Sequence, residues 1–132
     1  MLSLADREKI ESLVRSADEA ATRRDDAGYA ALYTEDGVME GSKGNAEGRA
    51  AIRAAVKAVW AREPAGSEHL TGDVSIGEEE GEVVAHSTLV ATQAVSTLFA
   101  EASVTQTVRH TDKGWRIARR LIKEVAEGGS GA

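Results

Sequence analysis

The chain has 132 residues, of which 42% are hydrophobic, and this size suits one globular domain with a single core. Cysteine is absent, which excludes disulfides, thiolate nucleophiles and cysteine metal sites. The net charge of −6 argues against a nucleic-acid partner, and since we find no long apolar run and no export signal, we expect a cytoplasmic protein without membrane contact.

The first half of the sequence predicts three helices. Ser3 and Asp6 are typical of a helix start, and apolar residues then recur at helical spacing at Ile10, Leu13, Val14, Ala17, Ala20 and Ala21. Asp25 or Asp26 can cap a short second helix, which would carry Tyr29, Leu32 and Tyr33. A third helix begins between residues 45 and 48, ends before Pro64, and presents one apolar face of Ile52, Val56, Val59 and Trp60.

The remaining segments read as turns and strands. We expect a turn at 34–37, a brief strand at 38–40 and a flexible loop at 41–44. After Pro64, strands are predicted at 69–76, 83–95 and 98–110, followed by a hairpin turn at 111–114 and a last strand. Helices followed by an antiparallel meander indicate an α+β domain over residues 1–125, with residues 126–132 as a flexible tail.

Two polar residues interrupt the apolar face of the last hairpin. In its first strand Gln106 lies among alternating apolar residues, and in its second strand Arg119 shares a face with Trp115, Ile117 and Leu121. Polar groups on an otherwise apolar sheet face are typical of a pocket wall. A buried guanidinium needs a partner, which Glu40, Asp18 or an anionic ligand would supply.

Three segments resemble the NTF2-like superfamily. They are residues 26–40, the Glu-Gly-Arg-Ala-Ala-Ile-Arg run at 47–53 and the Gly-Trp-Arg-Ile-Ala run at 114–118. More narrowly they are similar to the SnoaL-like branch, with polyketide cyclases, scytalone dehydratase and ketosteroid isomerase. The resemblance implies a cystatin-like α+β cone, in which three N-terminal helices pack on a curved mixed or antiparallel sheet around a deep pocket, often in a homodimer.

The resemblance also implies site residues. The ketosteroid isomerase positions fall on Gly41, Gln106 and Ala17, which do not supply that enzyme's groups, so we do not expect a steroid isomerase of that type. The match to scytalone dehydratase is better, because His69 is similar to a pocket histidine and Asp18 lies near a first-helix carboxylate. A neutral imidazole can take a proton from a carbon beside a carbonyl, and a carboxylate can fix its tautomer.

These arguments predict one set of site residues and leave two functions open. His69 and Asp18 are the catalytic candidates, and the candidate ligand contacts are Gln106, Arg119, Glu40, Tyr33 and Trp60. His69 and Asp18 can also be read as solvent-facing residues, because each adjoins polar neighbours. The histidines show no metal-binding spacing, and we expect no cofactor.

The first possible function is that of a cofactor-independent isomerase, dehydratase or cyclase acting on a small hydrophobic or carbonyl-containing molecule. The second is a non-catalytic ligand-binding or dimerisation domain. We expect the first if the predicted residues surround one cavity, and the second if aliphatic side chains fill it.

Overall fold

The computed structural model describes residues 1–42, 44–93 and 97–125, with every side chain in those ranges except those of residues 97–99. Helices and strands follow one another in the order α1 (Leu4–Arg23), α2 (Asp26–Ala31), β1 (Tyr33–Gly41), β2 (Gly44–Glu47), α3 (Arg49–Trp60), β3 (Glu68–Glu79), β4 (Glu82–Gln93), β5 (Thr97–Thr111) and β6 (Gly114–Glu124). Predicted strand residues 94 and 95 and the predicted tail 126–132 lie outside the described residues.

The long helix α1 begins and ends with local hydrogen bonds. The backbone N–H of Asp6 donates to Ser3 Oγ at 3.0 Å, and the Ser3 N–H donates to Asp6 Oδ2 at 3.2 Å, so the predicted capping box is confirmed. Arg24 ends the helix in the left-handed conformation, with φ 60°. The predicted apolar face is buried and ends in Ala17, Ala20 and Ala21, small residues that let the helix approach the sheet closely.

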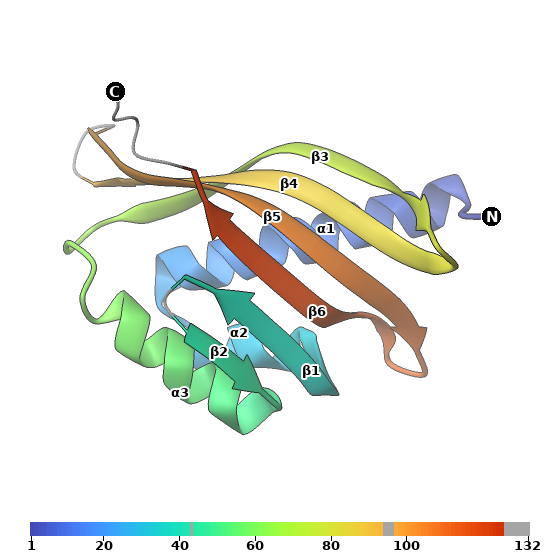
Figure 1. Ribbon diagram of the computed structural model, residues 1–132, viewed down its shortest axis with the longest axis horizontal. Coiled ribbons are helices and arrows are strands. Elements are labelled where there is room, and N and C mark those ends of the chain that lie inside the picture. Colours follow the sequence, from blue (N-terminus) through green and yellow to red (C-terminus); the bar gives the residue numbers. More distant parts are fainter. Residues whose placement is uncertain (43, 94–96, 126–132) are drawn as a thin grey trace.

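The six strands form one mixed sheet in the order β2-β1-β6-β5-β4-β3. Only the β1–β6 pair is parallel among the described strands, and the others are antiparallel. Figure 1 shows the long strands β3, β4 and β5 curving over α1, while α3 lies beside β1 and β2. The predicted α+β cone is thereby confirmed. None of the helices in the described ranges is long and apolar enough to cross a membrane.

The prediction for residues 33–47 was partly wrong. Tyr33 does not continue the second helix but begins β1, because its backbone pairs with Ile117 of β6. The predicted turn at 34–37 is therefore part of a strand. Residues 44–47, predicted as a loop and helix start, form β2, which pairs with β1 from Gly41↔Gly44 to Val38↔Glu47. In both places strand pairing overrides the local signal.

A β-bulge in β6 decides which side chains of that strand face the helices. The register with β5 shifts between Val108↔Ile117 and Thr107↔Arg119, so Ala118 is an extra residue. Beyond it the inward set moves by one residue: Ile117 and Arg120 are both buried, while Arg119 and Leu121 are exposed. Arg119 was predicted to share the face of Ile117, and this was wrong.

Candidate functional site

A cavity of about 610 Å³ lies between the helices and the inner face of the sheet. Its volume falls in the range of small-molecule sites, roughly 300–1,000 Å³. Most of its wall is apolar, with Ala55, Val56, Val59 and Trp60 from α3 and Leu89, Ala91, Ala102 and Ile122 from the sheet. The ionisable groups on that wall include Asp18, His69, Glu63, Glu40 and Arg120.

A buried polar cluster, made of Asp18, Thr71, Gln106 and Arg120, joins α1 to three strands. Arg120 Nη2 donates to Asp18 Oδ1 at 2.8 Å, and Arg120 Nη1 donates to Gln106 Oε1 at 3.0 Å. Thr71 Oγ1 donates to the other carboxylate oxygen of Asp18. The side chains of Arg120 and Asp18 are only 2% and 3% exposed. The cluster therefore holds a matched pair of charges away from water.

The guanidinium of Arg120 stays charged in this environment. Burial acts to lower the pKa of Arg120, but the neighbouring Tyr29 and Asp18 raise it, and the net shift is upward. The centre of the guanidinium also lies 5.8 Å from the Tyr29 ring centroid, in the range of a cation–π contact. Two buried donors of the cluster, Arg120 Nε and Gln106 Nε2, have no hydrogen-bond partner among the described residues.

His69 and Glu63 form an imidazole–carboxylate pair on the cavity wall. His69 Nε2 lies 2.9 Å from Glu63 Oε1, and the two side chains are 10% and 14% exposed. The same carboxylate oxygen lies 3.2 Å from Arg24 Nη2. His69 Nδ1 makes no hydrogen bond to any residue that the structure describes, so when Nε2 carries the proton, Nδ1 has a free lone pair.

The partners of this pair set the acidity of Glu63. Burial acts to raise the pKa of the Glu63 carboxyl, but the hydrogen bond and charge of His69 and the charge of Arg24 outweigh burial, so the pKa is lowered. Glu63 is therefore the carboxylate that orients the imidazole. Asp18 was predicted for that role, and the structure places it elsewhere because both of its oxygens are bonded to Arg120 and Thr71.

Aromatic side chains form the helical side of the site. Tyr29 and Trp60 line the cavity and meet edge to face, with ring centroids 5.3 Å apart. Tyr33 lies behind them, its hydroxyl 3.0 Å from that of Tyr29, and burial raises the pKa of Tyr33 well above its ordinary value. Tyr33 is thus a buried partner of Tyr29 and is not itself among the lining residues.

The structure separates the predicted residues into three groups. Asp18, His69, Glu40 and Trp60 line the cavity, and Gln106 and Tyr33 lie one layer behind it. Arg119 points to the outer face, where its Nη2 lies 2.6 Å from Glu40 Oε1. The pairing with Glu40 is as expected, but the predicted pocket position of the arginine belongs to Arg120.

Three cavity residues were missed by the sequence reasoning: Arg120, Glu63 and Tyr29. Arg120 was hidden by the bulge, since strict alternation assigns its neighbour to the inner face. Glu63 follows α3, in a connection whose path no sequence pattern specified. Tyr29 did carry a signal, because it belongs to the apolar face of the short second helix, but packing alone explained that face.

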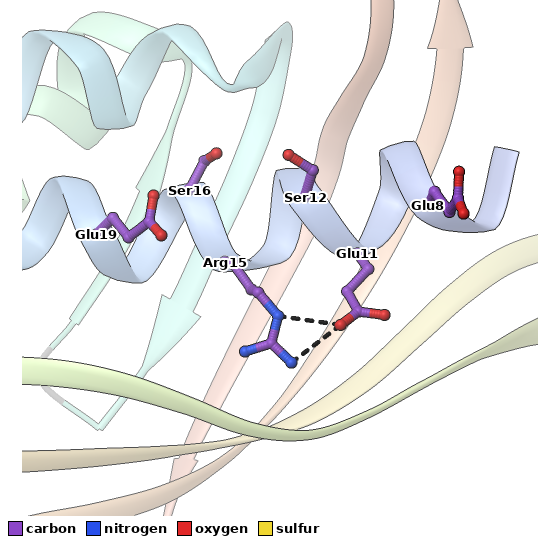
Figure 2. A pocket seen from close by; sticks show the side chains of 6 residues that line it. All are labelled: Glu8, Glu11, Ser12, Arg15, Ser16 and Glu19. Atoms are coloured by element: carbon purple, nitrogen blue, oxygen red, sulfur yellow. Dashed lines mark hydrogen bonds and ion pairs between the residues drawn. The ribbon is translucent and has the colours of Figure 1, made fainter. Parts of the chain in front are cut away.

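A second hollow, of about 400 Å³, runs along the outer side of α1 (Figure 2). Every residue that lines it comes from this one helix, and the Glu11–Arg15 pair spans one helical turn at 2.9 Å. An ion pair at this spacing on a solvated helix face is worth only a few tenths of a kcal/mol, roughly 0.3–0.5. We therefore assign no site to this hollow. Among the residues the structure describes, no group of histidine and carboxylate side chains could hold a metal ion.

The fold and the cavity define a cone-shaped domain with a polar cluster on an apolar wall. The chain belongs to the SnoaL-like domain family, whose model matches residues 2–121. The predicted membership is thus confirmed. No curated protein matches the chain in sequence.

Solved structures of NTF2-like and cystatin-like proteins are similar in fold. A protein of unknown function from Nostoc punctiforme superposes with a TM-score of 0.87 at 22% identity, covering 96% of each chain. An NTF2-like protein from Novosphingobium aromaticivorans gives 0.80 at 28% identity, over 96% of this chain and 86% of the other. A scytalone dehydratase-like protein from the same organism gives 0.77 at 18% identity, over 92% and 85%.

Proposed function

We propose that this protein binds a small organic molecule in the cavity and catalyses proton transfer on it without a cofactor, as an isomerase, dehydratase or cyclase does. One observation carries the proposal: the oriented imidazole of His69 and the charged pair Asp18–Arg120 lie on the wall of the same cavity. The family includes neighbours described as dehydratase-like, which is consistent with such chemistry.

The residues divide the work as follows. His69 is the general base that takes a proton from a carbon beside a carbonyl group, and Glu63 holds its tautomer and stabilises the imidazolium that forms. Arg120 donates to the oxygen on which negative charge develops. The apolar and aromatic wall of Trp60, Tyr29 and Leu89 binds the body of the molecule and excludes water.

The exchange of α-protons for deuterium tests this proposal. We use 2-tetralone as the probe in D₂O and follow the loss of its α-proton signals by NMR, with and without the protein. The wild-type protein should accelerate exchange, and His69→Ala should remove about 10²-fold of that acceleration. Glu63→Gln should lose less, because it leaves the imidazole in place. His86→Ala is the matched control, since His86 is an exposed histidine paired with Glu79.

Exchange at the wild-type rate in His69→Ala would refute the catalytic proposal. A second function, ligand binding without catalysis, is favoured by one observation: Asp18 and Arg120 are already paired with each other, so only His69 is free to move a proton. That function predicts that the probe binds and that neither protein accelerates exchange. Dimerisation through the sheet and a location in the cytoplasm remain predictions, and equilibrium sedimentation of the purified chain tests the first.

A further inference from the structure

The buried polar cluster contains a charge balance that bears on the ligand. Arg120 is the cationic group on the cavity wall that is also fully withdrawn from water, and its charge is balanced by Asp18 at 2.8 Å. The carboxylate is held in place on both sides, by Arg120 and by Thr71. The pair therefore presents hydrogen-bond donors to the cavity without presenting a net positive charge.

The donors in this cluster exceed the acceptors. Arg120 Nε and Gln106 Nε2 are buried and have no partner within the described ranges. A buried donor without an acceptor costs roughly 1–3 kcal/mol, so an oxygen placed beside Arg120 gains a hydrogen bond that the free protein lacks. Gln106 offers its carbonyl oxygen to Arg120, which fixes the guanidinium and leaves the remaining N–H groups for the ligand.

The same arrangement discriminates by charge. A ligand carboxylate beside Arg120 would add a second negative charge next to Asp18, in a region where neither side chain is more than 3% exposed. Two carboxylates that share one cation in a poorly solvated site repel each other, and one of them must leave or take up a proton. A ketone or ester oxygen accepts the hydrogen bond without that cost.

We propose that the cavity selects an uncharged ligand that presents a carbonyl oxygen to Arg120, and that Asp18 is the residue that rejects the corresponding carboxylate. This inference rests on the proposed function and narrows its substrate class. It adds a specificity role for a residue that is not the base.

Three probes of one shape test the inference: 2-acetylnaphthalene, 2-naphthoate and 2-ethylnaphthalene, which are a ketone, a carboxylate and a hydrocarbon. Their dissociation constants are measured by isothermal titration calorimetry at neutral pH. We expect the wild-type protein to bind the ketone about tenfold more tightly than either of the others, which corresponds to ~1.4 kcal/mol. This series involves no substitution, so it decides the proposal even where a variant fails to fold.

The variant Asp18→Asn then tests the cause. Its amide oxygen still accepts a hydrogen bond from Arg120, but the cation is no longer balanced, so the preference should reverse and the carboxylate should bind more tightly than the ketone. Asp26→Asn is the matched control: it makes the same change of net charge at a residue that pairs with Arg53 and does not line the cavity, and it should keep the wild-type preference.

The outcomes separate this inference from the proposed function. Equal binding of ketone and hydrocarbon, tighter binding of the carboxylate by the wild type, or an unchanged preference in Asp18→Asn overturns the inference. The proposed function then still stands if His69→Ala slows proton exchange on 2-tetralone. Absence of heat with all three probes, together with no accelerated exchange, overturns both.

Discussion

Two consecutive arginines of β6 lie in opposite surroundings. Arg119 points to the outer face of the sheet, where its side chain is 58% exposed and pairs with Glu40 at 2.6 Å. Arg120 points inward, is 2% exposed and pairs with Asp18 at 2.8 Å. The two ion pairs have similar lengths. They differ in what each arginine would lose without its carboxylate, since water can replace Glu40 but cannot reach Asp18.

The comparison shows why distance alone does not rank ion pairs. In water the attraction between two charges is weak and is offset by the ordering of long side chains. In the interior each charge has given up its hydration, so the pair contributes little beyond that loss, but removal of one member leaves a charge without solvent. We therefore expect the inner pair to control stability and ligand choice, and the outer pair to affect neither strongly.

The largest effect should follow from Arg120→Met. This change leaves Asp18 as an unpaired buried carboxylate and should lower the free energy of unfolding by about 3–5 kcal/mol, measured by urea denaturation. The double variant Asp18→Leu with Arg120→Met is the control, because it removes both charges. Its loss should be smaller than that of Arg120→Met alone, and a larger loss would contradict the account of the buried pair.

A smaller loss is expected for Gln106→Leu. The amide oxygen of Gln106 accepts from Arg120 Nη1 at 3.0 Å, and without it a further buried N–H group has no partner, at a cost of about 1–3 kcal/mol. Urea denaturation measures the change. Gln93→Leu, at a partly exposed residue of β4, is the matched control and should stay near the wild type. Equal losses in the two variants would show that Gln106 only fills space.

Much of the fold could be predicted from the sequence, because its signals are local. The Ser3–Asp6 cap, the apolar face of α1 and the alternation in β4 and β5 each specify one element, and the resemblance specified how the elements assemble. The start of β1 was not predictable in this way. Its first residue, Tyr33, is placed by pairing with a strand more than eighty residues away, and local spacing cannot report such a partner.

The site could be predicted only in part, for the same reason. His69 and Asp18 were identified, and both line the cavity. Arg120 was not, because one bulged residue, Ala118, exchanges the two faces of β6, and an alternating pattern cannot reveal where such a shift occurs. Glu63 depended on the course of a connection between α3 and β3. Pocket residues of this kind are set by register and loop path, which arise from the whole fold.

An intermediate case is the pair His69–Glu63, whose side chains are 10% and 14% exposed. The lowered pKa of Glu63 means that its ion pairs contribute stability above the ordinary value of 4.5, and that this contribution is lost as the pH falls through the lower folded-state value. Glu63→Gln should therefore cost about 0.5–1 kcal/mol at neutral pH, after allowance for screening by solvent.

The same variant should differ less from the wild type near pH 3, because protonation then removes the charge from both proteins. Urea midpoints at the two pH values measure this. Glu68→Gln, at an exposed residue of β3, is the control and should show little change at either pH. A gap between Glu63→Gln and the wild type that widens towards acid would contradict the sign assigned to the shift.

The smallest effect is expected for Arg119→Met, which removes the outer ion pair and keeps the length of the side chain. Glu40 is then released to water, and its carboxylate is only 27% exposed at present, so hydration replaces part of the lost attraction. The free energy of unfolding should fall by less than about 1 kcal/mol, and added salt should reduce even that difference. Binding of 2-acetylnaphthalene should not change, because Arg119 does not line the cavity. A loss as large as that of Arg120→Met would mean that Glu40 is held away from water after all, and that the two faces of β6 do not differ in the way that the exposed fractions indicate.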